Sequence, residues 1–159
     1  MNNVLKFMAL VSPAFAVACA GQSFSQITTD AANIAGGVAA AAQTLRNGGM
    51  LPAQQQTAVD NAVSDLQAAA TDVAQATTAA AKKGAVAQEV AAFNAVASAL
   101  AGAKGIPQNV TTVLTAADVL LPILEASVGL PVTASASATA MTPDEANKIL
   151  SSAAARLHT

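Results

Sequence analysis

The chain has 159 residues, of which 53% are hydrophobic, 3% aromatic and 10% charged, with neither Trp nor Tyr. This length suits a single domain, and a net charge of −2 without a basic stripe argues against a nucleic-acid partner. Alanine supplies much of the hydrophobic content and buries little area per residue, which predicts a thin core. We expect an all-α fold: an alanine-rich helical hairpin or small bundle of about four helices after an N-terminal signal segment, with a C-terminal amphipathic helix.

Residues 1–18 have the three-part layout of a bacterial export signal. A short polar region ends at Lys6, and the apolar stretch from Phe7 to Ala18 is too short to span a bilayer comfortably. Small residues then converge on the tetrapeptide Ala16-Val17-Ala18-Cys19. We therefore predict a signal peptide that is cleaved after Ala18.

Cys19 is the only cysteine, so it has no partner for a disulfide within the chain. The tetrapeptide that it ends resembles the lipobox of bacterial lipoproteins, in which two small residues precede a cysteine that receives diacylglycerol and becomes the new N-terminus. The match departs from that pattern at Ala16, where leucine is usual. Ordinary A-x-A cleavage followed by secretion, or an uncleaved N-terminal anchor, are the alternatives.

The resemblance is to small exported lipoproteins of bacteria and of phages or prophages, and it is confined to the N-terminal signal and Cys19. It implies lipidation of Cys19 and attachment to a membrane through that lipid. Residues 19–24 would then be a flexible tether.

Residues 25–129 are predicted to form the helical bundle. Its first helix spans Ser25 to Arg46, with Asp30 near the start and Arg46 near the end, an orientation that suits the helix dipole. Gly36-Gly37 is a predicted weak point, because each glycine costs about 1 kcal/mol relative to alanine in an exposed helix. The helix should end at Asn47-Gly48-Gly49.

A second helix is predicted from Ala53 to Lys83, and Gly84 should close it and lead directly into a third, so that the two form an antiparallel hairpin. Lys82-Lys83 would then complement the dipole at a helix C-terminus. Apolar residues at spacings of three, four and seven predict a narrow seam that is also suited to self-association or to a protein partner. The predicted inner positions are Val59, Leu66, Val73, Val90, Phe93 and Leu100.

Pro107 opens a fourth helix, in which apolar residues from Val110 to Val128 surround much of the circumference. This pattern predicts burial against protein, with Asp118 and Glu125 pointing outward. The two acids argue against a membrane span, because a carboxylate near the bilayer centre is costly. The alternative function class, a membrane-active protein of the holin type, depends on this helix and on the N-terminal apolar stretch.

Residues 130–141 have no helical period and are rich in Ser, Thr and Ala, as is typical of a linker. Residues 142–159 are predicted to form the C-terminal helix. Thr142-Pro143-Asp144-Glu145 has the capping-box pattern, with Pro at the first helical position and acids in the first turn. Ile149 and Leu150 contribute to its one apolar face.

The sequence offers little catalytic chemistry. His158 is the sole histidine and lies beside the C-terminus, and the sequence has no metal-ligand cluster, nucleophile–base pair or phosphate-binding glycine motif. We expect no catalytic residues, cofactor or metal. The predicted function is a non-enzymatic structural or interaction role for a lipid-anchored or secreted protein of the bacterial envelope.

Overall fold

The computed structural model describes residues 22–101, 103, 105–132 and 141–158. Within this part of the chain it contains five α-helices, a short 3-10 helix and no strand, which confirms the predicted all-α class. The elements are α2 (Phe24–Asn47), α3 (Ala53–Gln75), α4 (Ala79–Leu100), α5 (Gln108–Ser127), α6 (Pro143–Ala155) and η1 (Arg156–His158). The predicted signal peptide, Cys19 and most of the predicted linker lie outside the described residues.

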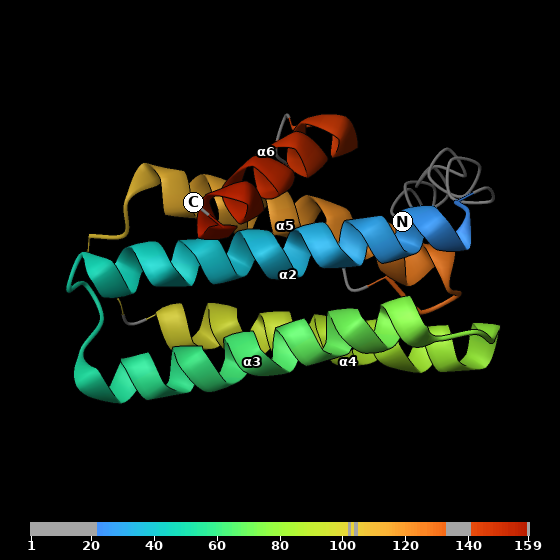
Figure 1. Cartoon of the computed structure of the whole chain (residues 1–159), viewed down its shortest axis with the longest axis horizontal. Helices are drawn as coiled ribbons and strands as arrows, with labels where there is room; N and C mark the ends of the chain where they lie inside the picture. The colour runs from blue at the N-terminus through green and yellow to red at the C-terminus, as the bar shows by residue number, and fades with distance from the viewer. Residues whose placement is uncertain (1–21, 102, 104, 133–140, 159) are drawn as a thin grey trace, which may run out of the picture.

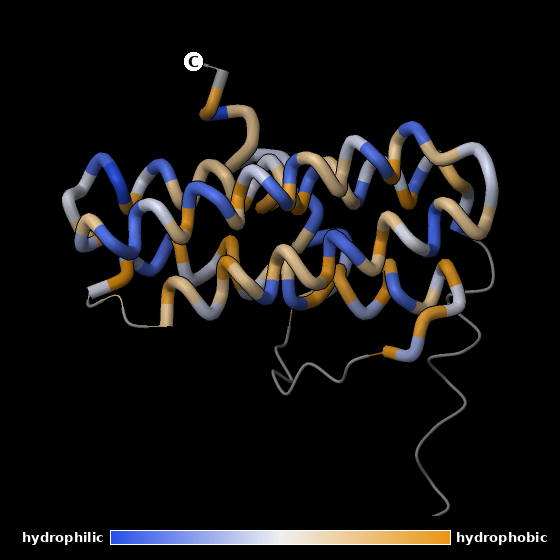
Figure 2. The backbone as a smooth tube through the Cα atoms, turned by 90° about the horizontal axis from the view of Figure 1, so that it is seen from below, coloured by the Kyte–Doolittle hydropathy of each residue, from blue (hydrophilic) through white to orange (hydrophobic). Residues whose placement is uncertain are grey.

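Helices α2, α3, α4 and α5 run along the long axis of the molecule, and α6 crosses over α2 and α5 (Figure 1). The most extensive contact joins α3 and α4, while α2 contacts α3, α5 and α6. Hydrophobic residues recur among hydrophilic ones along each helix (Figure 2), as expected for helices that bury one face. Helix α2 is therefore the element against which most of the others pack.

The predicted hairpin is present, but its turn lies in a different place. Helix α3 ends at Gln75, and Ala76 has an extended backbone with φ −66° and ψ 118°. Thr78 caps α4, because its Oγ1 accepts a hydrogen bond from the Ala81 N–H at 3.2 Å. Gly84, the predicted break, is exposed inside α4. The Thr78 hydroxyl satisfies a free N–H at the start of α4, so the helix begins there. One glycine costs only about 1 kcal/mol in a helix interior, so Gly84 does not interrupt α4.

The shifted turn also corrects the interpretation of Lys82-Lys83. The pair lies at the beginning of α4 and not at the C-terminus of α3, so the helix dipole does not favour its charge. Other contacts, described below, hold these two side chains.

Helices α2 and α6 each begin with a capping box. Ser23 Oγ accepts from the Gln26 N–H at 3.3 Å, and Gln26 Oε1 accepts from the Ser23 N–H at 3.1 Å. In the same way Thr142 Oγ1 accepts from the Glu145 N–H at 3.3 Å, and a Glu145 carboxylate oxygen accepts from the Thr142 N–H at 2.8 Å. The bond from the Thr142 N–H, and a second from the Thr142 hydroxyl at 2.9 Å, lower the pKa of the Glu145 carboxyl. The predicted start of the C-terminal helix is confirmed.

The core combines fully buried Ile, Leu and Val side chains from all five helices with alanines whose exposure is zero, among them Ala31, Ala116 and Ala146. Of the predicted inner positions of the hairpin, Val90 is only half-buried. The other five are buried: Val59, Leu66, Val73, Phe93 and Leu100.

Gly36 and Gly37 mark the place where α6 crosses α2. A Cβ on Gly36 would lie 2.7 Å from Ala154 Cβ, and a Cβ on Gly37 would lie 2.6 Å from Leu150 Cδ2 and 3.2 Å from Leu150 Cα. Only glycine permits so close an approach of the two backbones. The predicted weak point in α2 is thus the docking position of α6.

Candidate functional site

A buried carboxylate, Asp30, joins three parts of the chain at one end of the bundle. It lies in the second turn of α2 and is only 5% exposed. Its two oxygens accept hydrogen bonds from Asn147 Nδ2 on α6 at 2.9 Å and from Gln22 Nε2 at 3.2 Å. Asn33 Nδ2, also on α2, donates to Asn147 Oδ1 at 3.2 Å. We call Gln22, Asp30, Asn33 and Asn147 the Asp30 cluster.

Gln22 also connects this cluster to α5. Its Oε1 accepts a hydrogen bond from Ser127 Oγ at 2.8 Å, and the same hydroxyl lies 2.7 Å from the Ile123 carbonyl oxygen. The residue that precedes the N-cap of α2 is therefore fixed by two side-chain bonds. Because both of its partners lie on packed helices, the start of α2 is fastened to the body of the protein.

Glu89 on α4 is the least compensated polar side chain of the core. It has no exposed surface, and neither carboxylate oxygen has a hydrogen-bond partner among the described residues. Burial raises the pKa of this carboxyl to about 8, and the nearby Asp30 carboxylate contributes to the rise. At neutral pH Glu89 is therefore mostly protonated in the folded protein.

Lys82, two turns before Glu89 on α4, is 2% exposed and bonds to α2. Its Nζ donates to the Phe24 carbonyl oxygen at 3.4 Å and to Thr28 Oγ1 at 3.2 Å. The same ammonium lies 4.6 Å from the centroid of the Phe24 ring, within range of a cation–π interaction. Lys82 thus fastens the start of α4 to the start of α2, at the same end as the Asp30 cluster.

Lys83 bonds in the other direction, to the end of α5. Its Nζ donates to the Gly129 carbonyl oxygen at 3.0 Å. Gly129 has φ +71°, and the Leu130 N–H bonds to the Glu125 carbonyl while the Gly129 N–H bonds to that of Ala126, the pattern of a Schellman motif. The left-handed backbone of Gly129 therefore turns its carbonyl within reach of Lys83.

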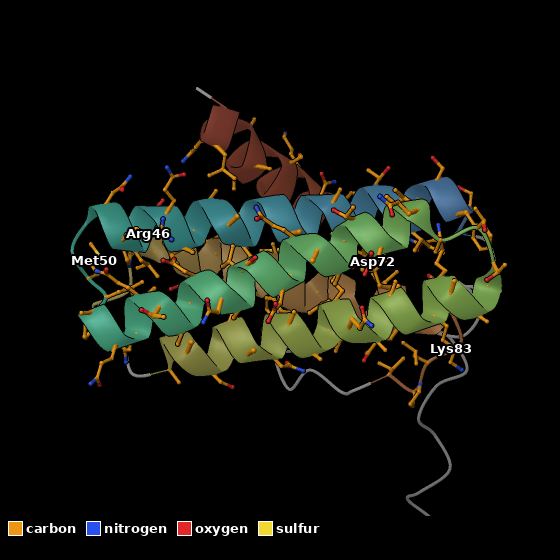
Figure 3. All side chains as sticks on the ribbon, turned by 60° about the horizontal axis from the view of Figure 1, so that its bottom comes forward. Arg46, Met50, Asp72 and Lys83 are labelled. Carbon is orange, nitrogen blue, oxygen red and sulfur yellow. The ribbon has the colours of Figure 1, made fainter. Side chains whose placement is uncertain are left out.

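The opposite end of the bundle has a different character. Arg46 on α2 forms an exposed ion pair with Asp60 on α3. Arg46 and Met50 lie at one end of the molecule, and Asp72 and Lys83 at the other (Figure 3). Exposed ion pairs contribute little to stability, so this pair is expected to add less than the partly buried hydrogen bonds of the Asp30 cluster.

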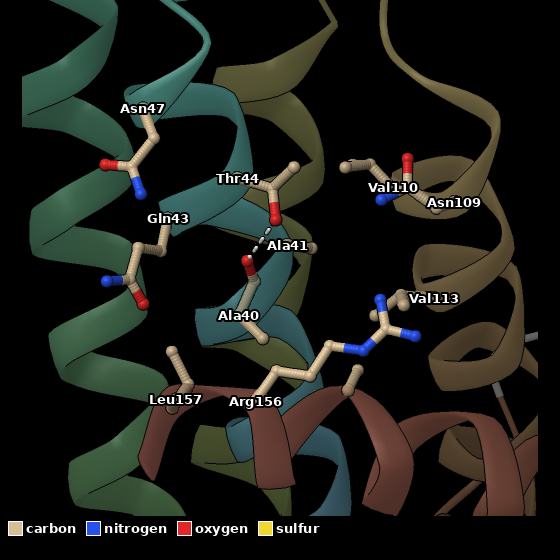
Figure 4. A pocket seen from close by; sticks show the side chains of 11 residues that line it. Ala40, Ala41, Gln43, Thr44, Asn47, Asn109, Val110, Val113, Arg156 and Leu157 are labelled. Carbon is tan, nitrogen blue, oxygen red and sulfur yellow. Dashed lines mark hydrogen bonds between the residues drawn. The ribbon is translucent and has the colours of Figure 1, made fainter. Parts of the chain in front are cut away.

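A pocket of about 210 Å³ opens near that opposite end, between the last turns of α2, the first turns of α5 and the end of α6 (Figure 4). Its polar lining includes Gln43, Asn47, Asn109 and Arg156. Thr44 Oγ1 also lines it but donates to the Ala40 carbonyl of its own helix at 2.9 Å. Amides and one guanidinium can hold a small polar molecule, yet the described lining residues include no acid, thiol or imidazole for catalysis.

The structure describes some of the residues singled out in the sequence and not others. Cys19 and Ala18 lie outside the described residues. The outward orientation predicted for Glu125 is wrong, since its side chain is 3% exposed, whereas Asp118 is half-buried. One side of an all-round apolar helix cannot stay in water when α2, α4 and α6 all contact it. Within the described residues, no three His, Cys, Asp or Glu side chains come together as a metal site would require.

The burial of two ionisable residues on α4, Lys82 and Glu89, was not predicted, although the sequence carries a signal for it. Positions 82, 86, 89, 93, 96 and 100 alternate at spacings of four and three, and all six are buried. Lys82 and Glu89 therefore lie on the same seam as Val86 and Phe93. A strict seven-residue register would have placed both charges in the core.

No family model, no curated protein and no solved structure matches this chain.

Proposed function

We propose that this chain is an exported protein of the bacterial envelope that is held at a membrane by a lipid on Cys19 and acts through contacts with other molecules, without catalysis. The observation that carries the proposal is the tetrapeptide Ala16-Val17-Ala18-Cys19 at the end of an apolar leader. The capped start of α2 follows closely, with Ser23 as its N-cap. An anchor at Cys19 would therefore stand directly before the folded body.

The proposed modification follows the chemistry of the lipoproteins that this segment resembles. A glycerophospholipid would transfer its diacylglyceryl group to Cys19 Sγ, forming a thioether, while the thiol proton leaves with the phosphorylated headgroup. Water would then hydrolyse the Ala18–Cys19 peptide bond. The mature chain would begin at a lipidated cysteine, and one thioether-linked diacylglyceryl group supplies two acyl chains for stable anchoring.

The use of the polar side chains supports an interaction role. Asp30 and Asn147 bond to each other across helices, and Lys82 bonds to the start of α2. These groups hold helices together. The exposed faces of α3 and α4 carry mostly Ala, Ser, Thr, Asn and Gln, with Asp60, Asp65 and Asp72 on α3 and Lys83 on α4 as their charged side chains. Such faces suit contact with another protein or with a second copy of the chain.

Lipid labelling of cells that express the full chain tests the proposal. The native chain should incorporate radioactive palmitate, and mass spectrometry should find the lipid on an N-terminal Cys19. Cys19→Ser should lose the label and accumulate as unprocessed precursor, whereas the matched exposed change Ser64→Ala should have no effect. Normal processing of Cys19→Ser would instead support ordinary cleavage and secretion.

A membrane-active role remains the second candidate because of α5. Among the described residues, α5 is the one helix that is long and apolar enough to cross a membrane by length and composition. Such a helix is equally typical of a soluble core, and here α5 packs against α2 and α6 with Leu120, Leu124 and Glu125 buried. A chain that begins at Ala20 should therefore remain soluble and helical when mixed with liposomes. Partitioning that resists carbonate extraction would favour the membrane-active role.

A further inference from the structure

We propose that the end of the bundle formed by the start of α2, the α3–α4 turn and the end of α5 lies against the lipid surface. This inference rests on the proposed lipid anchor and adds an orientation to it. The opposite end, with the Arg46–Asp60 ion pair and the pocket, would then face away from the membrane.

The length of chain between Cys19 and the folded body sets the first constraint. Gln22 is fixed to Asp30 and Ser127 by its two side-chain hydrogen bonds. Three residue steps separate Cys19 from Gln22, and an extended chain covers at most about 3.6 Å per residue. A lipid on Cys19 would therefore keep Gln22 within about 11 Å of its anchor point, so this end could not move far from the surface.

The exposed side chains at this end provide the second, independent argument. Among the described residues, two large hydrophobic side chains are exposed, Phe24 at 50% and Val132 at 52%. Phe24 begins α2, and Val132 follows three residues after Gly129, which accepts the bond from Lys83. Phe24 lies at the end of the bundle where the described chain begins, and Val132 is three residue steps from Gly129 at that end. We call Phe24, Lys83 and Val132 the anchor-side patch.

The chemistry of the anchor-side patch suits the boundary between lipid and water. An aromatic ring and an aliphatic side chain can enter the acyl boundary, while an exposed lysine stays among the headgroups. Lysine near an anionic leaflet is favourable, so the exposed Lys83 would favour this end. Lys82 is buried beneath the Phe24 ring, and the exposed Asp72 places one negative charge at the same end. Three side chains would give only weak adsorption alone, so the lipid would provide attachment and the patch would set the orientation.

Site-directed fluorescence quenching on the full processed protein tests this orientation. A thiol-reactive dye would be placed at the near end through Thr77→Cys or Ala80→Cys, both exposed and outside the patch, and at the far end through Gln54→Cys. The proteins would be reconstituted in vesicles of phosphatidylcholine with a minority of phosphatidylglycerol that carry a headgroup-level nitroxide quencher. We expect at least a twofold loss of fluorescence for both near-end dyes and almost none at Gln54.

The patch itself is tested by combining Phe24→Ala, Lys83→Ala and Val132→Ala with the dye at Thr77. Quenching at Thr77 should fall to the level seen at Gln54, while an unchanged circular dichroism spectrum shows that the fold persists. Asn47→Ala, an exposed change at the far end, should leave quenching at Thr77 intact. If the triple change leaves quenching intact, the patch does not orient the bundle.

The same samples separate this inference from the proposed function. If mass spectrometry finds no lipid on Cys19, the anchor itself is refuted, and dye uptake by the native thiol would confirm the loss. If the lipid is present but near and far dyes are quenched equally, the anchor stands and the orientation is overturned. Self-quenching between near-end dyes without quenching by the nitroxide would show a second copy on the patch, which also overturns the lipid contact.

Discussion

The α2–α6 contact and the α3–α4 hairpin are built from similar alanine-rich sequence, yet their helices pack against each other in different ways. Between α2 and α6, Gly36 and Gly37 let the backbones approach closely, and the polar side chains beside the crossing bond to one another. In the hairpin, a regular seam holds the helices together but places Glu89 in the core without a partner among the described residues. Small residues therefore allow either close approach of two helix backbones or a repeated seam of side chains. Of the two contacts, only that between α2 and α6 provides hydrogen-bond partners for its buried polar groups.

The largest expected effect breaks the α2–α6 contact. Leu150→Ala removes a side chain that has no exposed surface and lies directly over Gly37, so it should cost about 2–5 kcal/mol of unfolding free energy. Urea unfolding followed by circular dichroism at 222 nm measures the loss. Ser151→Ala, an exposed neighbour on α6, should change little. A loss below about 1 kcal/mol for Leu150→Ala would mean that α6 is not part of the cooperative fold.

The next prediction concerns the unpartnered acid of the hairpin. Because the pKa of Glu89 is about 8 in the folded protein and 4.5 ordinarily, the folded state binds a proton more tightly than the unfolded state. The contribution of Glu89 to stability is therefore complete below pH 4.5 and is lost as the pH rises towards 8 and beyond.

Glu89→Gln removes this titration. The variant should be more stable than the native chain by roughly 2–4 kcal/mol at pH 8.5 and nearly equal to it at pH 5. Unfolding curves at the two pH values test the difference, with the exposed change Asp72→Asn as the control. Equal effects of Glu89→Gln at both pH values would show that Glu89 is solvated in the folded protein.

Two alanine substitutions of glycine should have opposite signs. Gly37→Ala places a Cβ against Leu150 and should cost about 1–3 kcal/mol through overpacking. Gly84→Ala meets no atom within 4 Å and should stabilise α4 by about 1 kcal/mol. Thermal unfolding of the two variants distinguishes a steric cost at the α2–α6 crossing from the gain in helix propensity that alanine brings. A stabilising Gly37→Ala would contradict the close crossing.

The smallest effect compares the caps of the two regions. Thr142→Ala removes the capping box of α6 and should cost about 1 kcal/mol. Thr78→Ala removes a single capping bond from the longer α4 and should cost about 0.5 kcal/mol. Equal losses, measured by urea unfolding, would show that the box gives α6 no more than a simple cap.

Local signals in the sequence were enough to predict the helices, because caps and terminators act within a few residues. Pro107 and the Thr142 box placed the starts of α5 and α6 correctly. Gly84 predicts a turn at residue 84, but the capping hydroxyl of Thr78 places the turn of the hairpin before residue 79. The spacing of apolar residues in α4 indicates that Lys82 and Glu89 lie in the core, but it does not indicate that Lys82 bonds to α2.

Partners on distant helices depend on tertiary structure that no local pattern contains. Asp30 could be placed near a helix start, yet its bond to Asn147 joins residues 117 positions apart. Gly36-Gly37 could be predicted as a weak point of the first helix, but the sequence does not say which helix crosses it. The candidate site was therefore less predictable than the fold.

The distance along the chain between α2 and α6 has a consequence for the timing of folding. The hydrogen bond between Asn33 and Asn147 joins residues 114 positions apart, whereas the hairpin joins neighbouring segments. Low contact order favours early formation of the hairpin, whereas the first helix stays incomplete until α6 docks against it. The last helix would thus act as the closing step of assembly, so truncation near the C-terminus should harm a segment that was made first.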